Sequence, residues 1–211
     1  MQWTPDATIK NALWIGGGQW AGKTTVAGIL AERHGLVQYY YDFHAARGHD
    51  DRRVATAVRQ GTPYQPPDWE KVWIGPTPAQ MAADVLATFP QYFEWVLDDL
   101  RGIGTTHPVL AEGWGLRPEL VAAVTDPARM VVMVPTDEWR RHQLTHLPRA
   151  GAVSHQVSDP ALANRNRVAR DRLIAADAVA SARALGVRVI EVDGSRPATA
   201  IADEIADHFR L

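Results

Sequence analysis

One short glycine-rich segment constrains this chain more than any other. Residues 17–25 read Gly-Gly-Gln-Trp-Ala-Gly-Lys-Thr-Thr, and from Gly17 the spacing is G-x-x-x-x-G-K-T, the pattern of a phosphate-binding P-loop. A glycine-rich turn at a helix N-terminus directs several backbone N–H groups at one point, where the helix dipole also favours negative charge. We therefore expect this segment to bind a nucleoside triphosphate through Gly17, Gly18, Gln19, Trp20, Ala21, Gly22, Lys23, Thr24 and Thr25.

The sequence on either side of the loop supports this interpretation. The apolar run 12–15 is typical of a buried strand, and residues 25–33 have the pattern of a helix that ends near Gly35. Between such elements Lys23 can reach the β- and γ-phosphate oxygens, and the Thr24 hydroxyl can bind Mg²⁺. The alternative interpretation is an ordinary glycine-rich turn.

Length and composition indicate a globular protein with a single domain over residues 1–211. The 211 residues are 46% hydrophobic and 22% charged, which is ordinary for such a protein. The formal charge of −2 gives no general attraction to nucleic acid or to an anionic membrane. The absence of cysteine excludes disulfides, thiolate metal sites and cysteine nucleophiles. With no signal segment and no apolar run as long as a membrane span, we expect a cytoplasmic protein without nucleic-acid or membrane partners, and a homodimer is left open.

Strand and helix patterns alternate along the chain. Strands are expected at 12–15, 36–41, 107–111, 130–134 and 187–192. Helices are expected at 25–33, 47–60, 79–100 with an interruption near Pro90, 117–124, 136–147 with Thr136 as the N-cap, 161–185, and after Pro197. Five strands separated by helices predict an α/β fold with a parallel, doubly wound sheet. A Trp- and Pro-rich insertion at about 61–78 and an Arg-bearing lid at about 147–160 interrupt this pattern.

Ligands in such sheets bind at the carboxyl ends of the strands, where two acidic residues are expected. Asp42 follows the second strand and is the first candidate for a general base or a Mg²⁺ ligand, with helix or loop capping as the alternative. Glu112 ends the third strand and is a second candidate for Mg²⁺, for contact with an acceptor, or for the base in place of Asp42. An unpaired buried carboxylate is costly, which makes a purely structural role for Glu112 the weaker interpretation.

Arginines and aromatic residues supply the other candidates. Arginine forks match phosphate geometry, so Arg149, Arg167 and Arg170 are expected to compensate charge on a transferred phosphoryl group. Trp69, Trp73 and Trp114 fall in segments near the expected site and are candidates for the wall of an acceptor pocket, with core packing as the alternative. His142 and His146 have the spacing of a zinc site, but the glutamate of H-E-x-x-H and a third ligand are missing, so we expect no zinc.

Taken together, these segments resemble the P-loop small-molecule kinases related to nucleotide, nucleoside and shikimate kinases. The matching stretches are 17–25, 41–43, 110–113, 167–172 and 189–196. The resemblance implies a three-layer α/β/α fold with strand order 2-3-1-4-5, a lid after the fourth strand, and ATP with Mg²⁺ as cofactors. It also implies that Asp42 and Phe43 bind the acceptor, and that the loop 193–197, with Asp193, Ser195 and Arg196, holds the adenine. The chain departs from the family in the segment 61–78 and in having Glu112 where Asp is usual.

The predicted function is therefore transfer of the γ-phosphoryl group of ATP to a hydroxyl of a nucleoside, sugar-like or antibiotic-like acceptor. Lys23, Thr24 and the lid arginines would compensate the phosphate charge while Asp42 deprotonates the acceptor. Kinases of nucleic-acid ends share this scaffold, but the near-neutral charge disfavours them. The alternative from another class is a nucleotide-dependent regulatory NTPase or switch that uses no acceptor.

Overall fold

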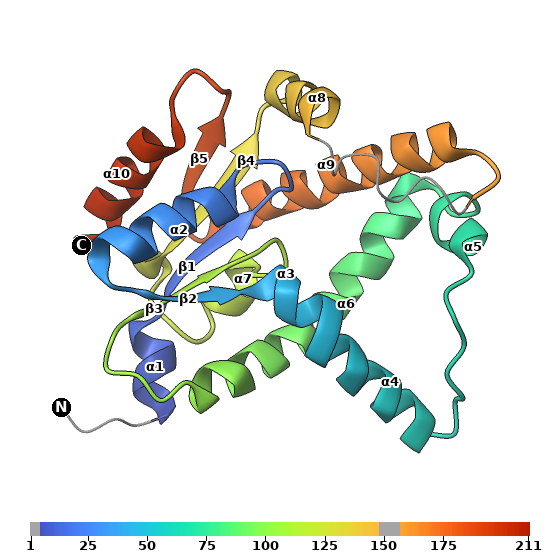
Figure 1. Ribbon diagram of the computed structural model, residues 1–211, viewed down its shortest axis with the longest axis horizontal. Helices are drawn as coiled ribbons and strands as arrows, with labels where there is room; N and C mark the ends of the chain where they lie inside the picture. The colour runs from blue at the N-terminus through green and yellow to red at the C-terminus, as the bar shows by residue number, and fades with distance from the viewer. Residues whose placement is uncertain (1–4, 148–156) are drawn as a thin grey trace.

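The computed structural model describes residues 5–147 and 157–211, and its centre is a parallel sheet of five strands (Figure 1). The strands are β1 Leu13–Gly17, β2 Val37–Tyr40, β3 Val109–Glu112, β4 Met130–Pro135 and β5 Arg188–Val192. They pair in the order β2-β3-β1-β4-β5. This confirms the predicted parallel sheet and its order 2-3-1-4-5.

Helices cover both faces of the sheet. They are α1 Pro5–Asn11, α2 Lys23–His34, α3 Tyr41–His44, the π-helix η1 Ala45–His49, α4 Asp50–Arg59, α5 Trp69–Trp73, α6 Pro78–Gly102, α7 Pro118–Val121, the 3₁₀ turn η2 Pro127–Arg129, α8 Asp137–His146, α9 Pro160–Ala184 and α10 Ala198–Phe209. Among the described residues, none of these helices combines the length and the apolar character that crossing a membrane requires.

Two hydrophobic cores lie on opposite faces of the sheet because side chains alternate along each strand. In β1, Trp14 belongs to the core beneath α6 and α9, whereas Leu13 and Ile15 belong to the core beneath α2 and α10. The central strands β1, β3 and β4 are buried throughout, as expected for parallel strands covered on both faces. The resulting three-layer arrangement is the one predicted.

The register of the strands places the expected functional segments at one edge. Ile15 of β1 and Tyr40 of β2 are both register partners of Glu112, the last residue of β3. The P-loop, Asp42 and the residues after Glu112 therefore leave the sheet side by side at its carboxyl end. In Figure 1 the beginnings of α2 and α3 lie at this end of the sheet.

Two predicted features of the sequence differ in the structure. The helix expected to be interrupted near Pro90 is continuous from Pro78 to Gly102, so that prediction was wrong. Pro90 is exposed, and its neighbours Phe89 and Phe93 are buried in the core, so packing holds the helix while solvent can bond the carbonyl left without a partner. The insertion 61–78, in which no helix was expected, contains the short helix α5, whose N-cap Asp68 accepts a hydrogen bond from the backbone N–H of Lys71 at 3.4 Å.

The helical run after β2 also begins earlier than expected, at Tyr41 rather than near residue 47, and contains one π-helical turn. A π turn brings residues five apart to the same side, and here these residues are His44 and His49. Both face the carboxylate of Asp99 on α6, with His49 Nε2 at 2.7 Å and His44 Nδ1 at 3.6 Å. Tyr39 donates its hydroxyl to the same carboxylate at 2.8 Å. Asp99 therefore joins β2 and the π turn to α6.

Candidate active site

The P-loop begins at the end of β1 and is held tightly against β4. Gly17 has φ 114°, and a Cβ on it would lie 2.1 Å from the carbonyl oxygen of Met133, so only glycine fits here. The next residue, Gly18, donates its backbone N–H to the same Met133 carbonyl at 2.8 Å. Gly22, with φ 78°, is the N-cap of α2, and the helix starts at Lys23. The backbone N–H groups of this first turn thus point toward the loop, as phosphate binding requires.

Lys23 is buried and crosses the loop. Its ammonium group donates a hydrogen bond to the carbonyl of Gly18 at 2.7 Å. Burial lowers the pKa of Lys23, and the negative charges of Asp42, Glu112 and Asp171 oppose this shift. A buried ammonium surrounded by three carboxylates lies at the centre of a strongly charged site, which favours a ligand that is itself charged.

Glu112 lies directly behind the P-loop threonine. The hydroxyl of Thr24 donates to Glu112 Oε1 at 3.0 Å, and the Glu112 side chain is only 2% exposed. Burial raises the pKa of Glu112, Asp42 raises it further, and Lys23 and the Thr24 hydrogen bond lower it. A carboxylate kept in such a costly place is typical of a site that holds a cation.

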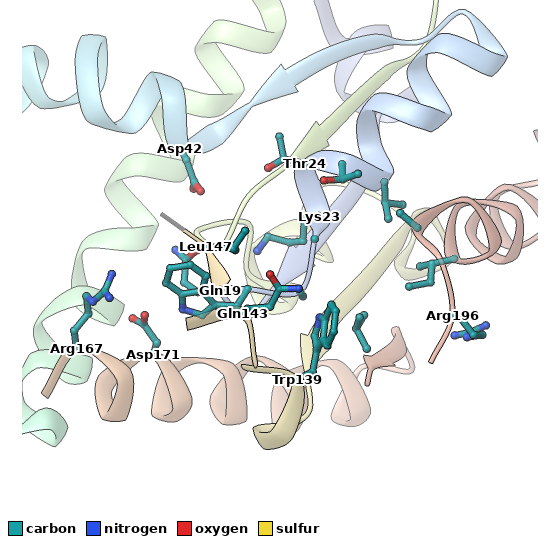
Figure 2. A pocket seen from close by; sticks show the side chains of 18 of the residues that line it. Gln19, Lys23, Thr24, Asp42, Trp139, Gln143, Leu147, Arg167, Asp171 and Arg196 are labelled. Atoms are coloured by element: carbon teal, nitrogen blue, oxygen red, sulfur yellow. The ribbon is translucent and has the colours of Figure 1, made fainter. Parts of the chain in front are cut away.

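Asp42 occupies the first turn of α3 and lines the cavity in front of the P-loop. It interacts electrostatically with Lys23 and with Glu112, which places it across the loop from both. Figure 2 shows the Asp42 side chain extending into the same space as Lys23 and Thr24. Asp42 thus shares one cavity with Lys23 and Thr24.

The oxygens of Thr24, Asp42 and Glu112 fit a Mg²⁺ ion that also binds phosphate. Mg²⁺ usually takes one or two carboxylates, and its other ligands are substrate phosphates and water. Over residues 5–147 and 157–211 there is no cluster of three or more His, Cys, Asp or Glu residues that could hold a metal without such help. The donor set therefore suits a metal that arrives with a nucleotide.

A cavity of about 630 Å³ runs from the P-loop to both flanks of the site (Figure 2). One flank is formed by α9 and α5, with Arg167, Arg170, Asp171 and Trp73. The other is formed by α8 and the start of α10, and its lining residues are Trp139, Gln143, Leu147, Val192, Arg196, Ala198 and Ile201. The volume is in the range of small-molecule sites, and the two flanks offer room for two ligands or two parts of one ligand.

The guanidinium groups of the two arginines on the first flank lie over aromatic rings. The guanidinium of Arg170 lies 4.9 Å from the ring centre of Trp73 and 5.5 Å from that of Trp114, and its NH2 group is 2.6 Å from Asp171. Arg167 lies 5.5 Å from the ring centre of Trp20, and burial lowers its pKa. Arginines fixed in this way can face anionic groups without the entropy loss of a free side chain. Arg149 and most of the expected lid lie outside the described residues.

Several other predicted residues lie away from the cavity. Phe43 is 53% exposed and its ring is covered by Arg47, while Trp69 is on the outer side of α5 and does not line the cavity. Trp114 packs edge-on against Phe89 and does not line the cavity, but its ring centre lies 5.5 Å from the Arg170 guanidinium, which does. Glu112 acts from behind Thr24 rather than from the cavity wall.

The loop after β5, which was expected to hold the adenine, has one of its three predicted side chains, Arg196, at the cavity. Asp193 Oδ1 accepts hydrogen bonds from the backbone and the hydroxyl of Ser195, so these two side chains bond to each other. Arg196 lines the cavity but pairs with Glu204 at 2.6 Å. Beside Arg196, the cavity wall at this point is made by Val192, Trp139, Gln143 and the start of α10.

Sequence reasoning missed several of the lining residues, among them Trp139, Gln143 and Asp171. The edge of the Trp139 ring that carries Cε3 lies close to Gly194, where a Cβ would come within 2.3 Å of Cε3. A glycine after β5 and a tryptophan in the first turn of α8, the helix that follows β4, are a weak signal, because only the packing brings the two residues together. His142 and His146, considered for zinc, instead continue a column of stacked rings from Trp139, with centroids 4.9 Å and 4.1 Å apart.

Comparison with known proteins supports the fold. No family model and no curated protein sequence matches the chain. Among solved structures, the shikimate kinase from Acinetobacter baumannii in complex with shikimate is 17% identical, with 96% of each chain covered and a TM-score of 0.50. Shikimate kinase from Aquifex aeolicus vf5 (14% identity, 93% and 94% covered, TM-score 0.38) and a gluconokinase from Sinorhizobium meliloti 1021 (12%, 96% and 93%, 0.43) are also similar. The chain thus has the fold of a P-loop small-molecule kinase.

Proposed function

We propose that this chain is an ATP-dependent phosphotransferase that moves the γ-phosphoryl group to a hydroxyl of a small molecule. The observation that carries the proposal is one continuous cavity that joins the P-loop to Asp42 and to the arginine flank. An acceptor is favoured over a nucleotide-dependent switch because the cavity continues past the P-loop to Asp42, Arg167 and Arg170, which leaves room for a second ligand. The kinase names of the structural neighbours agree with this proposal.

In the proposed reaction the chain supplies position and charge. The P-loop amides and Lys23 would hold the triphosphate, and Thr24, with Glu112 behind it, would hold its Mg²⁺. Bound Mg·ATP would supply an electrophilic phosphorus with a good leaving group. Asp42 would orient the acceptor hydroxyl and accept its proton as the new P–O bond forms.

We propose that the other flank holds the nucleobase. Trp139 offers an aromatic surface opposite Ala198 and Ile201, and the Gln143 side chain is adjacent on the same helix. Stacking on the indole ring would orient the base, and the Gln143 amide can both donate and accept hydrogen bonds at its edge. The triphosphate would then extend along the cavity toward Lys23.

The test is ATP consumption with a panel of hydroxyl compounds at saturating Mg²⁺: shikimate, gluconate, nucleosides, neutral sugars and hydroxylated antibiotics. We expect at least one compound to raise ADP formation well above the rate without acceptor, with one phosphorylated product formed per ADP. Lys23→Ala should abolish this rate. Slow hydrolysis that no compound stimulates would reject the phosphotransferase and favour the nucleotide-dependent switch.

A further inference from the structure

The short loop after β3, residues 113–116, fills the space between the P-loop strand and the segment that carries Asp42. On one side the carbonyl oxygen of Leu116 lies against Gly16, where a Cβ would come within 2.3 Å of it. On the same side the backbone N–H of Gly113 donates to the carbonyl of Ile15 at 3.0 Å. The loop is therefore fixed to the strand that leads into the P-loop.

On its other side the loop packs against Tyr41. A Cβ on Gly115 would lie 2.1 Å from Cζ of Tyr41 and 2.2 Å from its hydroxyl oxygen, and a Cβ on Gly113 would lie 2.3 Å from Cβ of Tyr41. The Tyr41 side chain thus runs along the loop backbone from Gly113 to Gly115. Tyr41 is 2% exposed and belongs to the main core beneath α6, so its ring has little freedom to move.

Tyr41 is the first residue of α3, and Asp42 follows it directly. A displacement of the ring would be transmitted through one peptide unit to the carboxylate at the cavity. The strand register leads to the same conclusion. Tyr40 of β2 and Ile15 of β1 both pair with Glu112 of β3, and the segments that follow these three strands diverge from this level of the sheet. The thickness of loop 113–116 therefore determines how far Asp42 lies from the P-loop.

We propose that loop 113–116 is a spacer that sets the position of Asp42 relative to the P-loop, with Gly115 and Tyr41 as positioning residues. This inference rests on the proposed phosphotransferase function, because the proposed reaction requires Asp42 at a defined distance from the P-loop. Gly115 is the informative position since its φ is not in the left-handed region. Alanine can adopt its backbone conformation, so the substitution tests space rather than backbone strain.

The experiment is a double-mutant cycle with Gly115→Ala and Tyr41→Leu. The new methyl group meets Tyr41 at 2.1 Å, whereas ordinary contacts begin near 3.4 Å, so ring and loop must separate by more than an ångström. Misplacement by about 1 Å can lower the rate about 100-fold, so we expect kcat of Gly115→Ala to fall by that factor while the Kd for Mg·ATP stays within about threefold. Leucine lacks Cζ and the hydroxyl, so the double variant should recover about tenfold over Gly115→Ala.

Control measurements separate a change in the position of Asp42 from a loss of protein stability. Gly28→Ala adds a methyl group that meets nothing within 4 Å, and it should match the wild type. Thermal unfolding of every variant shows which ones are folded, and crystal structures of Gly115→Ala and the double variant report the position of Asp42. We expect Asp42 to be displaced from Lys23 in the single variant and restored in the double variant.

Each outcome decides the proposal. An unmoved Asp42 in Gly115→Ala, or a displaced Asp42 with unchanged kcat, overturns it, and so does a double variant no more active than Gly115→Ala. If the wild type phosphorylates no compound, the phosphotransferase function fails, and the spacer is then judged by the crystallographic position of Asp42 alone. If Gly115→Ala does not fold, Tyr41→Leu decides the question: a folded Tyr41→Leu with wild-type kcat would exclude Tyr41 as a positioning residue.

Discussion

The substitution Glu112→Gln tests two effects of the buried carboxylate separately: its cost to the free energy of unfolding and its contribution to Mg²⁺-dependent nucleotide binding. The substitution keeps an oxygen that can accept the Thr24 hydrogen bond, now 3.0 Å long, and removes the charge from a side chain that is 2% exposed. Burial is the main reason that the pKa of Glu112 is raised, and Lys23 offsets part of this cost. We therefore expect the ligand-free variant to be more stable than the wild type near pH 7, by about 1 kcal/mol.

The pH dependence of this difference has a defined sign. The pKa of Glu112 in the folded protein lies above the ordinary value of 4.5, so the unfolded chain loses its proton first as the pH rises. Well below pH 4.5 both states are protonated and the burial of Glu112 has no charge cost. Wild-type stability should then fall relative to Glu112→Gln as the pH rises through the folded pKa, and the difference should become constant above it.

The same substitution should weaken Mg²⁺-dependent nucleotide binding. Loss of a carboxylate that orients a metal ligand typically costs 10- to 100-fold in metal affinity, about 1.4–2.7 kcal/mol. The assays are urea unfolding between pH 4 and pH 8, and titration calorimetry of ATP with Mg²⁺ and with EDTA. Glu94→Gln is the matched control because Glu94 is exposed on α6. A variant that is destabilised more at pH 7 than at pH 4, with unchanged Mg·ATP affinity, would refute this reasoning.

Three further substitutions test other parts of the account. Asp42→Asn should lower kcat about 10²- to 10⁴-fold with ATP binding kept, and an unchanged kcat would move the base role to Glu112. Trp139→Ala should weaken ATP binding by about 1 kcal/mol or more through loss of base stacking, and equal affinity in calorimetry would remove the base from that flank. Asp99→Ala should lower the free energy of unfolding by about 1–3 kcal/mol, because buried His49 loses its bond to the carboxylate; an unchanged urea midpoint would contradict this.

The sheet and the P-loop could be predicted because their signals are local. Each strand is a short apolar run between polar turns, and the glycines and lysine of 17–25 have a spacing that serves few other purposes. The N-cap Thr136 could also be predicted, since its hydroxyl accepts a hydrogen bond from the backbone N–H of Trp139 at 3.2 Å, within the same turn. In each case the residues that determine the structure are neighbours in the sequence.

The walls of the cavity could not be predicted because they depend on how distant helices pack. Trp139 occupies its place at the cavity because Gly194, which follows a different strand, has no side chain to collide with its ring. Phe43 was expected beside the acceptor, but its ring faces outward under Arg47. The π turn that ends at His49 depends on Asp99, 50 residues further along the chain. Such contacts leave no periodic pattern in the sequence.

The central claim is that the turn before α2 holds the terminal phosphates of a nucleotide through its backbone and Lys23. Titration calorimetry at saturating Mg²⁺ measures this directly, with ATP and GTP as ligands and Lys23→Ala as the comparison. The account predicts a single site in the wild type and a large loss of affinity in the variant, since no other lysine lines the cavity in the described part of the chain. No binding heat with either nucleotide, or equal affinity for the variant, would contradict it.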